Sequence, residues 1–390
     1  MRSIIVLALT LFSTGSLCAQ TLFGQDSTRR AITPAVPFLL IAPDARSGAM
    51  GDVGAALEPD AVATHWNIGK LAFIDQDYGA SLSYTPWLGK IFNDMAIVYL
   101  TGYYKIDNEQ AVSASLRYFD LGNISFTNEF ADIIGTHNPQ EYSAALSYSR
   151  KLSQKLGLGV TAKYIHSNLT GGYGPNGIPS RPGRSVAADL GLYFNSELAV
   201  NGQESRLALA AVISNIGNQI TYLNDETESF VPTNLRLGTA YTTQLDPYNS
   251  LTFAVDLNKL MVPTPFGTLY EFDSDGNIIQ EPSTIQGIFG SFADAPDGFS
   301  EELKEFNVGV GMEYWYNEIV AGRAGYFFEH ADKGGRQFFT LGVGLRYQLF
   351  SMDFAYLVPQ EQQHPLAETL RFTLGVNFEK SPQQENSVTQ

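Results

Sequence analysis

Residues 369–378 read TLRFTLGVNF, and their side chains alternate strictly in character. Every second residue is apolar and those between are polar or small: Leu370, Phe372, Leu374, Val376 and Phe378 against Arg371, Thr373, Gly375 and Asn377. Successive side chains of a β-strand point to opposite faces. This stretch therefore predicts a strand with one apolar face.

The same period of two recurs upstream, which gives about fourteen predicted strands in all. They are 77–86, 94–105, 110–120, 141–149, 156–166, 185–194, 205–214, 234–242, 250–257, 305–314, 319–328, 337–347, 349–358 and 369–378. Each is close to the length that a tilted strand needs to cross a bilayer.

The charged residues inside these strands lie almost entirely on the face opposite the apolar one, including the ten that follow. These ten are Arg117, Lys163, Asp189, Arg236, Asp256, Glu313, Arg323, Arg346, Asp353 and Arg371. Gly, Ser and Ala dominate the rest of that face, which suits a crowded interior better than a solvated surface. The pattern favours apolar side chains facing lipid and a polar lumen, as in a transmembrane barrel, over a soluble sandwich.

The connections between predicted strands alternate in length. Long ones, such as 121–140 and 258–304, alternate with short turns, such as 106–109. Barrels of the outer membrane carry long loops outside and short turns in the periplasm. We therefore expect an all-β outer-membrane barrel over 77–378, with both termini periplasmic and a polar periplasmic tail at 379–390.

Composition agrees with export and excludes several other classes. The first residues form a secretory signal, and we expect cleavage after Ala19. The alternative, a lipoprotein acylated at Cys18, is disfavoured because Leu17 is not small. Cys18 is the only cysteine, so the mature chain has no thiol chemistry. The net charge of −16 argues against nucleic acid as a partner.

Residues 37–71, PFLLIAPDARSGAMGDVGAALEPDAVATHWNIGKL, follow neither a helical nor a strand period. The stretch is rich in Ala and Gly and is interrupted by proline, so it cannot form a core of its own. We expect residues 20–76 to form a plug-like segment in the lumen.

Motifs for chemistry are weak. Residues 172–177, GYGPNG, match a dinucleotide fingerprint, but prolines and a strand follow instead of a helix, which predicts a loop. Residues 273–277 resemble a calcium loop without its glycine, and a hairpin turned at Asp275-Gly276 is the better interpretation. The five histidines have no ligand spacing. We therefore expect no enzyme, metal or cofactor.

The connection 258–304 is long and contains the apolar stretch 285–292, IQGIFGSF. Loops of this size are usually functional or disordered, and exposed apolar residues indicate a protein or lipid contact. The alternative is a lid folded over the barrel mouth. The residues that we expect in a partner contact are Ile288, Phe289, Phe292 and Phe299.

The stretch 37–71 resembles the N-terminal signature of the PorV family of the type IX secretion system of Bacteroidota. The matching residues are Phe38-Leu39, Ile41, Pro43-Asp44-Ala45-Arg46, Gly48, Met50-Gly51-Asp52, Gly54, Ala55 and Trp66-Asn67. The related PorQ family shares parts of it. More broadly the chain is similar to the FadL superfamily of fourteen-stranded barrels, but its motif Asn-Pro-Ala-Gly-Leu here reads Asn67-Ile68-Gly69-Lys70-Leu71.

The resemblance implies binding of exported cargo through its C-terminal sorting domain. It also implies docking beside an SprA-type translocon barrel and delivery to a PorU-type attachment complex, within outer-membrane lipid. In the plug and lumen we expect Asp44, Arg46, Asp52, Trp66 and Asn67 to form a network with Arg236 and Arg371. The alternatives are a FadL-like transporter of hydrophobic small molecules and a passive porin.

Overall fold

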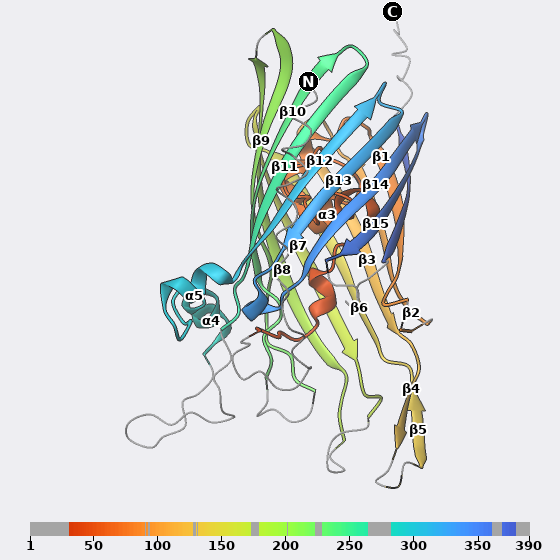
Figure 1. The fold of residues 1–390 in the computed structure, drawn as a ribbon, viewed down its shortest axis with the longest axis vertical. Coiled ribbons are helices and arrows are strands. Elements are labelled where there is room, and N and C mark those ends of the chain that lie inside the picture. The colour runs from red at the N-terminus through yellow and green to blue at the C-terminus, as the bar shows by residue number, and fades with distance from the viewer. Residues whose placement is uncertain are drawn as a thin grey trace, which may run out of the picture.

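A closed antiparallel barrel dominates the molecule (Figure 1). The computed structural model describes residues 31–89, 91–92, 94–127, 130, 132–172, 179–200, 202–222, 228–263, 282–360 and 369–379. Within them, fourteen strands close in the order β1-β16-β15-β14-β13-β12-β11-β10-β9-β8-β7-β6-β3-β2. The pairing of β1 with β16 completes the ring, so the barrel has no free edge.

All the predicted strands are confirmed. The barrel strands are β1 Tyr78–Pro86, β2 Met95–Lys105, β3 Gln110–Leu121, β6 Gln140–Lys151, β7 Leu156–Asn168, β8 Gly183–Val200, β9 Gln203–Gly217, β10 Asn234–Asp246, β11 Asn249–Leu260, β12 Phe306–Tyr316, β13 Val320–Phe328, β14 Gln337–Tyr347, β15 Phe350–Pro359 and β16 Leu370–Phe378. The largest difference is in β8 and β9, which continue pairing through Glu197 and Arg206 to Val200 and Gln203. Strict apolar alternation covers less of each strand than the ladder does, so the sequence pattern ended β8 too early and started β9 too late.

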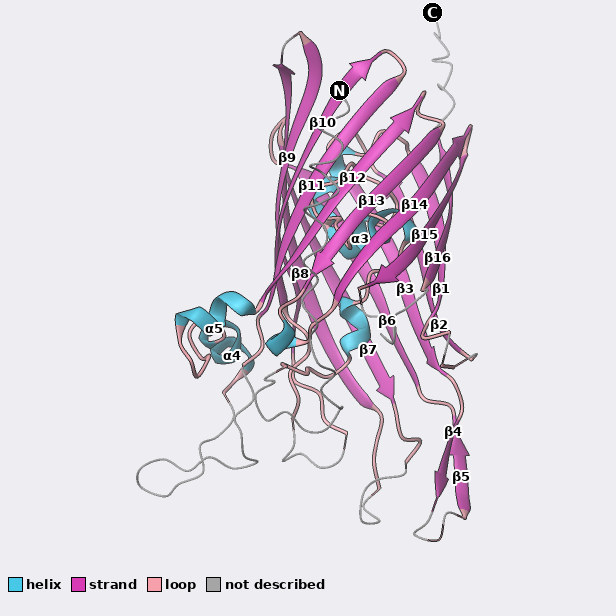
Figure 2. Cartoon of the chain, in the orientation of Figure 1, coloured by secondary structure: helices cyan, strands magenta, loops and turns pink. Residues whose placement is uncertain are grey.

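A second small sheet lies outside the barrel. β4 (Ile124–Thr127) pairs with β5 (Ile133–His137) within the connection that we predicted as a loop. Both strands are short and carry exposed apolar side chains, so they lack the buried face that makes a strand recognisable in sequence. In Figure 2 this hairpin extends beyond the barrel wall.

The two ends of the barrel differ. Short turns, such as Asp107–Glu109 between β2 and β3, lie at the end where β16 finishes, and the long connections lie at the other end (Figure 1). We call these the turn end and the loop end. The loop end also carries α4 (Thr284–Gly290), α5 (Phe299–Lys304) and η5 (Ala331–Lys333). No helix in the described ranges is long and apolar enough to cross a bilayer.

The strand faces are distributed as predicted. Large apolar side chains point outward and are exposed, among them Leu82, Leu146, Phe253, Leu341 and Leu374. The predicted lumen charges point inward: Arg117, Asp189, Asp256, Glu313, Arg323 and Arg371 are all buried. An apolar outside and a polar inside are the arrangement of a barrel in a lipid bilayer.

Residues 31–77 run through the barrel, and we call them the interior segment. They contain η2 (Pro37–Leu40), α2 (Ala45–Gly48), α3 (Ala63–Trp66) and η3 (Ile68–Phe73). The Ala35 amide donates to the Phe230 carbonyl in the β9–β10 connection, which places the start of the segment at the loop end. The expected mature N-terminus at residues 20–30 lies outside the described residues, as do the cleavage site and the tail from 380 onward.

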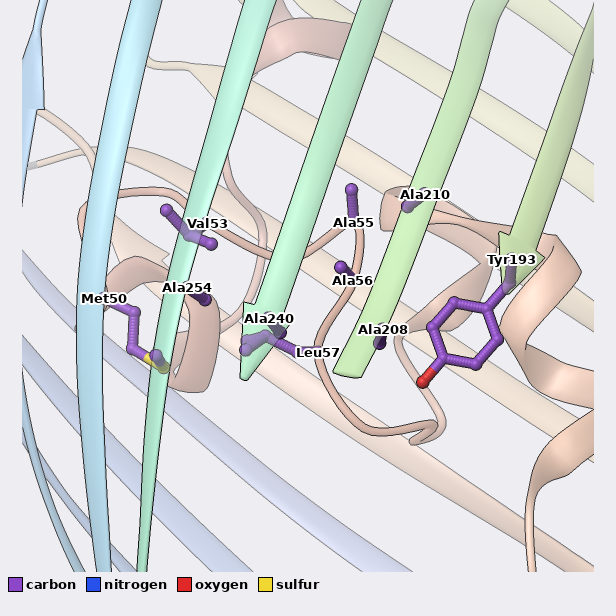
Figure 3. Packing of buried hydrophobic residues seen from close by; sticks show 10 residues of the cluster. All are labelled: Met50, Val53, Ala55, Ala56, Leu57, Tyr193, Ala208, Ala210, Ala240 and Ala254. Carbon is purple, nitrogen blue, oxygen red and sulfur yellow. The ribbon is translucent and has the colours of Figure 1, made fainter. Parts of the chain in front are cut away.

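Small side chains on the wall make room for the interior segment. Met50, Val53 and Leu57 pack with Tyr193 and with alanines of the wall strands (Figure 3). The alanines of that cluster, from both the segment and the wall, are Ala55, Ala56, Ala208, Ala210, Ala240 and Ala254. At the loop end, Phe38 and Leu39 join a second apolar cluster with Ile97, Phe119 and Ile165.

Gly51 and Gly325 bring the backbone of the segment against β13. Gly51 has φ +71, and a Cβ there would lie 2.5 Å from the Tyr326 carbonyl oxygen. A Cβ on Gly325 would lie 2.2 Å from the Gly51 nitrogen. Two backbones in contact cannot move aside as a flexible side chain can. The contact between the segment and β13 therefore requires glycine at both residue 51 and residue 325.

We therefore predict that Gly325→Ala displaces the interior segment from β13, at a cost of about 1–3 kcal/mol from overpacking. The measurement is thermal unfolding of the purified barrel, together with protease cleavage within residues 31–77. Gly322→Ala on the outer face of the same strand is the matched control, because its Cβ meets no atom within 4 Å. Equal unfolding temperatures for both variants would contradict the close backbone contact at Gly325.

Candidate functional site

Glu313 of β12 is the main anchor of the interior segment. Its carboxylate accepts from Arg46 Nη2 at 2.8 Å and Nε at 3.0 Å, and from Arg323 Nε at 2.6 Å. Arg46 also reaches Asp60 at 3.2 Å, and Arg323 reaches Asp353 at 2.6 Å. Because Arg46, Glu313 and Arg323 are all buried, each charge depends on the others for its solvation.

Two other predicted network residues meet as expected. Arg371 Nη1 lies 2.7 Å from Asp52 Oδ1, a direct ion pair between wall and segment. Asp44 has a different role from the one we predicted, since it binds within the segment. It caps α2 by accepting from the Ser47 amide at 2.8 Å, and it accepts from Trp66 Nε1 at 2.6 Å.

Arg236 is placed in the lumen, and of the segment residues expected in its network it contacts Trp66. Its Nε donates to Asn258 Oδ1 at 2.6 Å, and its guanidinium lies 4.5 Å from the centre of the Trp66 ring. The contact with the segment is thus a cation–π interaction. Asn67 caps η3 through the Gly69 amide and donates to the carbonyls of Ala55 and Leu192.

Several anchoring residues were not assigned from sequence. Asp256 accepts from the amides of Gly54 and Ala55 at 2.9 and 3.0 Å. Lys70 donates from Nζ to the Gly54 carbonyl at 3.0 Å. The inward position of Asp256 in its strand was visible in the sequence, but its backbone partners were not. No pattern in the sequence indicated a role for Lys70, because we compared the motif at residues 67–71 with its counterpart only by residue type.

Arg117 holds the loop-end half of the segment. Its Nη1 donates to the carbonyls of Phe38 and Leu39 at 2.9 and 3.0 Å. Its Nη2 lies 2.9 Å from His65 Nδ1, which accepts from it.

A cavity of about 1360 Å³ opens at the turn end and reaches the interior segment. Segment residues Arg46, Glu58 and Asp60 form part of its lining. Glu58 lies 3.3 Å from Arg206 and 4.0 Å from Arg346, both on the barrel wall. Charged residues of the segment therefore face this cavity together with charged residues of the wall.

The helices α4 and α5 lie beside the barrel at the loop end (Figure 1). Phe289 is 72% exposed and Phe299 is 77% exposed, and Phe292 is also exposed. Ile288 differs from our expectation, because it is buried and so is not presented to a partner. The exposed neighbours Ile285 and Leu303 complete i, i+4 pairs with Phe289 and Phe299, a spacing that we overlooked without the helices.

A buried ion cluster fixes α5 to the barrel. Lys259 Nζ of β11 lies 3.0 Å from Glu302 and 2.5 Å from Glu305. Lys333 Nζ lies 2.7 Å from Glu301 and 2.9 Å from Glu305. Burial opposes the charge of Lys333, but its hydrogen bonds to Glu301 and Glu305 outweigh burial and raise its pKa. These interactions present Phe299 and Leu303 on a rigid support.

Other sequence motifs give no site. Residues 173–178 and 264–281, which contain most of the Gly-rich motif and the whole calcium-like motif, lie outside the described residues. Within the described ranges, no group of three or more His, Cys, Asp or Glu could hold a metal ion.

The closed barrel, its apolar outer face and its charge-anchored interior segment define an integral outer-membrane β-barrel. A family model described as "Type IX secretion system protein PorV" matches residues 24–267. The chain therefore belongs to the PorV family.

Other comparisons concern overall shape. The Ralstonia pickettii toluene transporter TbuX aligns with a TM-score of 0.47 and 15% identity, over 87% of this chain and 98% of that chain. The Pseudomonas putida toluene transporter TodX gives 0.46 and 12%, over 84% and 95%. A Pseudomonas aeruginosa FadL homologue gives 0.44 and 12%, over 86% and 98%. A search of curated proteins found no match.

We predict that Glu313→Leu destabilises the barrel more than Arg46→Met does. The first change leaves Arg46 and Arg323 buried without their shared carboxylate, which typically costs about 3–5 kcal/mol. The second leaves Glu313 paired with Arg323. Thermal unfolding in detergent measures the difference, and an equal or reversed order would show that Glu313 is not the central anchor.

We also predict that Lys259→Met combined with Lys333→Met releases α5. Thermolysin cleavage within residues 282–305 should rise by more than about tenfold, because three buried carboxylates lose their cations. Lys304→Met is the control, since Lys304 pairs with Asp332 at the surface, where such pairs contribute about 0–1 kcal/mol. Unchanged cleavage in the double variant would exclude this role of the cluster.

Proposed function

We propose that this protein is a non-enzymatic component of type IX secretion that binds exported cargo at its loop end. In this proposal it receives cargo beside an SprA-type translocon barrel and carries it to a PorU-type attachment complex. Membership of the PorV family carries the assignment to the secretion system. Cargo binding and delivery are the parts that we add.

The orientation follows barrel convention. Long loops of outer-membrane barrels are extracellular and short turns are periplasmic. The loop end would then face the cell surface with the β4–β5 hairpin and with α4 and α5. Cargo that has crossed the membrane would meet this end first.

The interior supports the role of a carrier more than that of a conduit. Ion pairs bind the interior segment to β12 and β16, through Arg46–Glu313 and Asp52–Arg371. An apolar cluster around Phe38 and Phe119 joins the segment to the wall near the loop end. We propose that the interior segment is a plug, and that opening a path would require breaking buried ion pairs.

The loop-end helices are the proposed contact. Phe289 and Phe299 are large, exposed aromatic side chains on short helices, and α5 is held by its ion cluster before any partner binds. Aromatic anchors on a rigid support lose little conformational entropy on binding, which favours affinity. Phe292 adds a third exposed ring, whereas the buried Ile288 would contribute by packing α4.

The direct test is recovery of partners with the tagged protein. Phe289→Ser combined with Phe299→Ser should reduce recovery of cargo with C-terminal sorting domains, or of a very large barrel protein, by at least about tenfold. Phe130→Ser is the matched control, because Phe130 is 83% exposed in the β4–β5 connection. Wild-type recovery of both partners in the double variant would remove these residues from the contact.

Deletion of the whole chain separates the proposal from transport of hydrophobic small molecules. A secretion carrier predicts loss of surface-attached cargo with normal uptake of hydrophobic substrates. The opposite result would favour a transporter, and altered permeability to small polar solutes alone would favour a passive porin.

A further inference from the structure

A groove of about 580 Å³ runs along the outer wall where the barrel closes. It lies across β14, β15, β16, β1 and β2, away from the loop-end helices and from the anchored interior. Its outward-facing lining is apolar and includes Ala80, Leu82, Leu100, Tyr347, Phe350 and Leu374. Its volume lies in the range of ordinary ligand pockets.

Ala80 is the smallest outward-facing residue of the lining, and Gly102 lies beside it at the edge of the groove. Ala80 on β1 pairs directly with Gly102 on β2, and with Val376 on β16. The next outward residue on β1, Leu82, is large and faces Leu100 and Leu374 across the two pairings. A Cβ on Gly102 would approach other atoms no closer than 3.5 Å, so the small residue there is not required by crowding.

The inner face of the wall behind the groove carries small residues. Gly375 pairs with Ser81 on one side and with Ser351 on the other, which places three small inward-facing residues at one level. These three also line the turn-end cavity from inside. At this level of the barrel, small residues therefore lie on both faces of the wall.

We infer that this groove holds one acyl chain of a phospholipid. It is continuous with the apolar outer face of the same strands, which in the membrane is covered by lipid. Tyr347 and Phe350 flank the β14–β15 turn, where aromatic residues mark the bilayer interface. The acyl chain would therefore enter from the leaflet at the turn end. With periplasmic turns this is the inner leaflet of the outer membrane, which consists of phospholipid.

The expected consequence is retention of a lipid. In the bilayer every outward side chain contacts lipid, so contact alone is not a site. A chain that fits a concave surface makes more contacts than one on a convex barrel wall and leaves more slowly. The distinguishing property is therefore a lipid that survives extraction into detergent, and this inference does not depend on the secretion role.

The experiment is native mass spectrometry after extraction from nanodiscs of phosphatidylethanolamine and phosphatidylglycerol. The wild type should carry one phospholipid mass per barrel. Ala80→Leu and, from the neighbouring strand, Gly102→Leu should each reduce that fraction by at least about fivefold by filling the groove. Gly322→Leu should not, because it adds the same side chain to an open part of the outer wall.

Heat-modifiable migration on gels checks that each variant is folded. Absence of bound phospholipid on the folded wild type, or equal retention in the groove variants and Gly322→Leu, would overturn the inference. Purification from cells adds a second arm. Lipopolysaccharide or a second barrel protein could instead be recovered with the wild type and not with Ala80→Leu. That result would assign the groove to a different occupant and would reject the phospholipid inference.

Discussion

The structure depends on the need of buried charges for partners within the barrel. Glu313, Arg46 and Arg323 are all withdrawn from solvent, and each would be costly alone. Together they join a wall strand at residue 313 to a segment near the N-terminus, and the adjoining strand supplies the third member. The same constraint explains Asp52 with Arg371. A segment without a core of its own is thus held by ion pairs that span most of the sequence.

Side-chain size on the inner wall is the second constraint. Alanine, serine and glycine leave space for an irregular backbone, and Gly325 allows direct contact with it. Hydrogen bonds from the wall then satisfy the backbone of the segment, as Asp256 does for Gly54 and Ala55. The small wall residues and the hydrogen bonds from the wall together explain how a segment with no regular period adopts one defined path through the barrel.

The loop end uses the same principle outside the wall. Lys259 and Lys333 bind three glutamates around α5, so the charged side of that helix is buried and its apolar side is exposed. This is the reverse of an ordinary surface helix. This exposed apolar face is the surface that we propose binds a partner.

The sequence by itself determined the strands, the faces and the class of protein. Alternation with period two is imposed by lipid on one side and a filled lumen on the other, so it is legible in stretches such as 369–378. It also identified the irregular segment and its key residues, including Asp52 and Arg371. The ends of β8 and β9 and the β4–β5 hairpin were not predicted. In β8 and β9 the hydrogen-bonded ladder continues beyond the alternating pattern, and the β4–β5 hairpin forms without a lipid-facing side.

Only the tertiary structure decided which residues meet. Local pattern carries no information on contacts between residues hundreds of positions apart, so the choice of Glu313 for Arg46 could not be predicted. The same holds for Ile288, whose burial follows from the packing of a helix that has too few residues to show a period. The face presented by a short element is fixed by what it packs against, and that is a property of the whole fold.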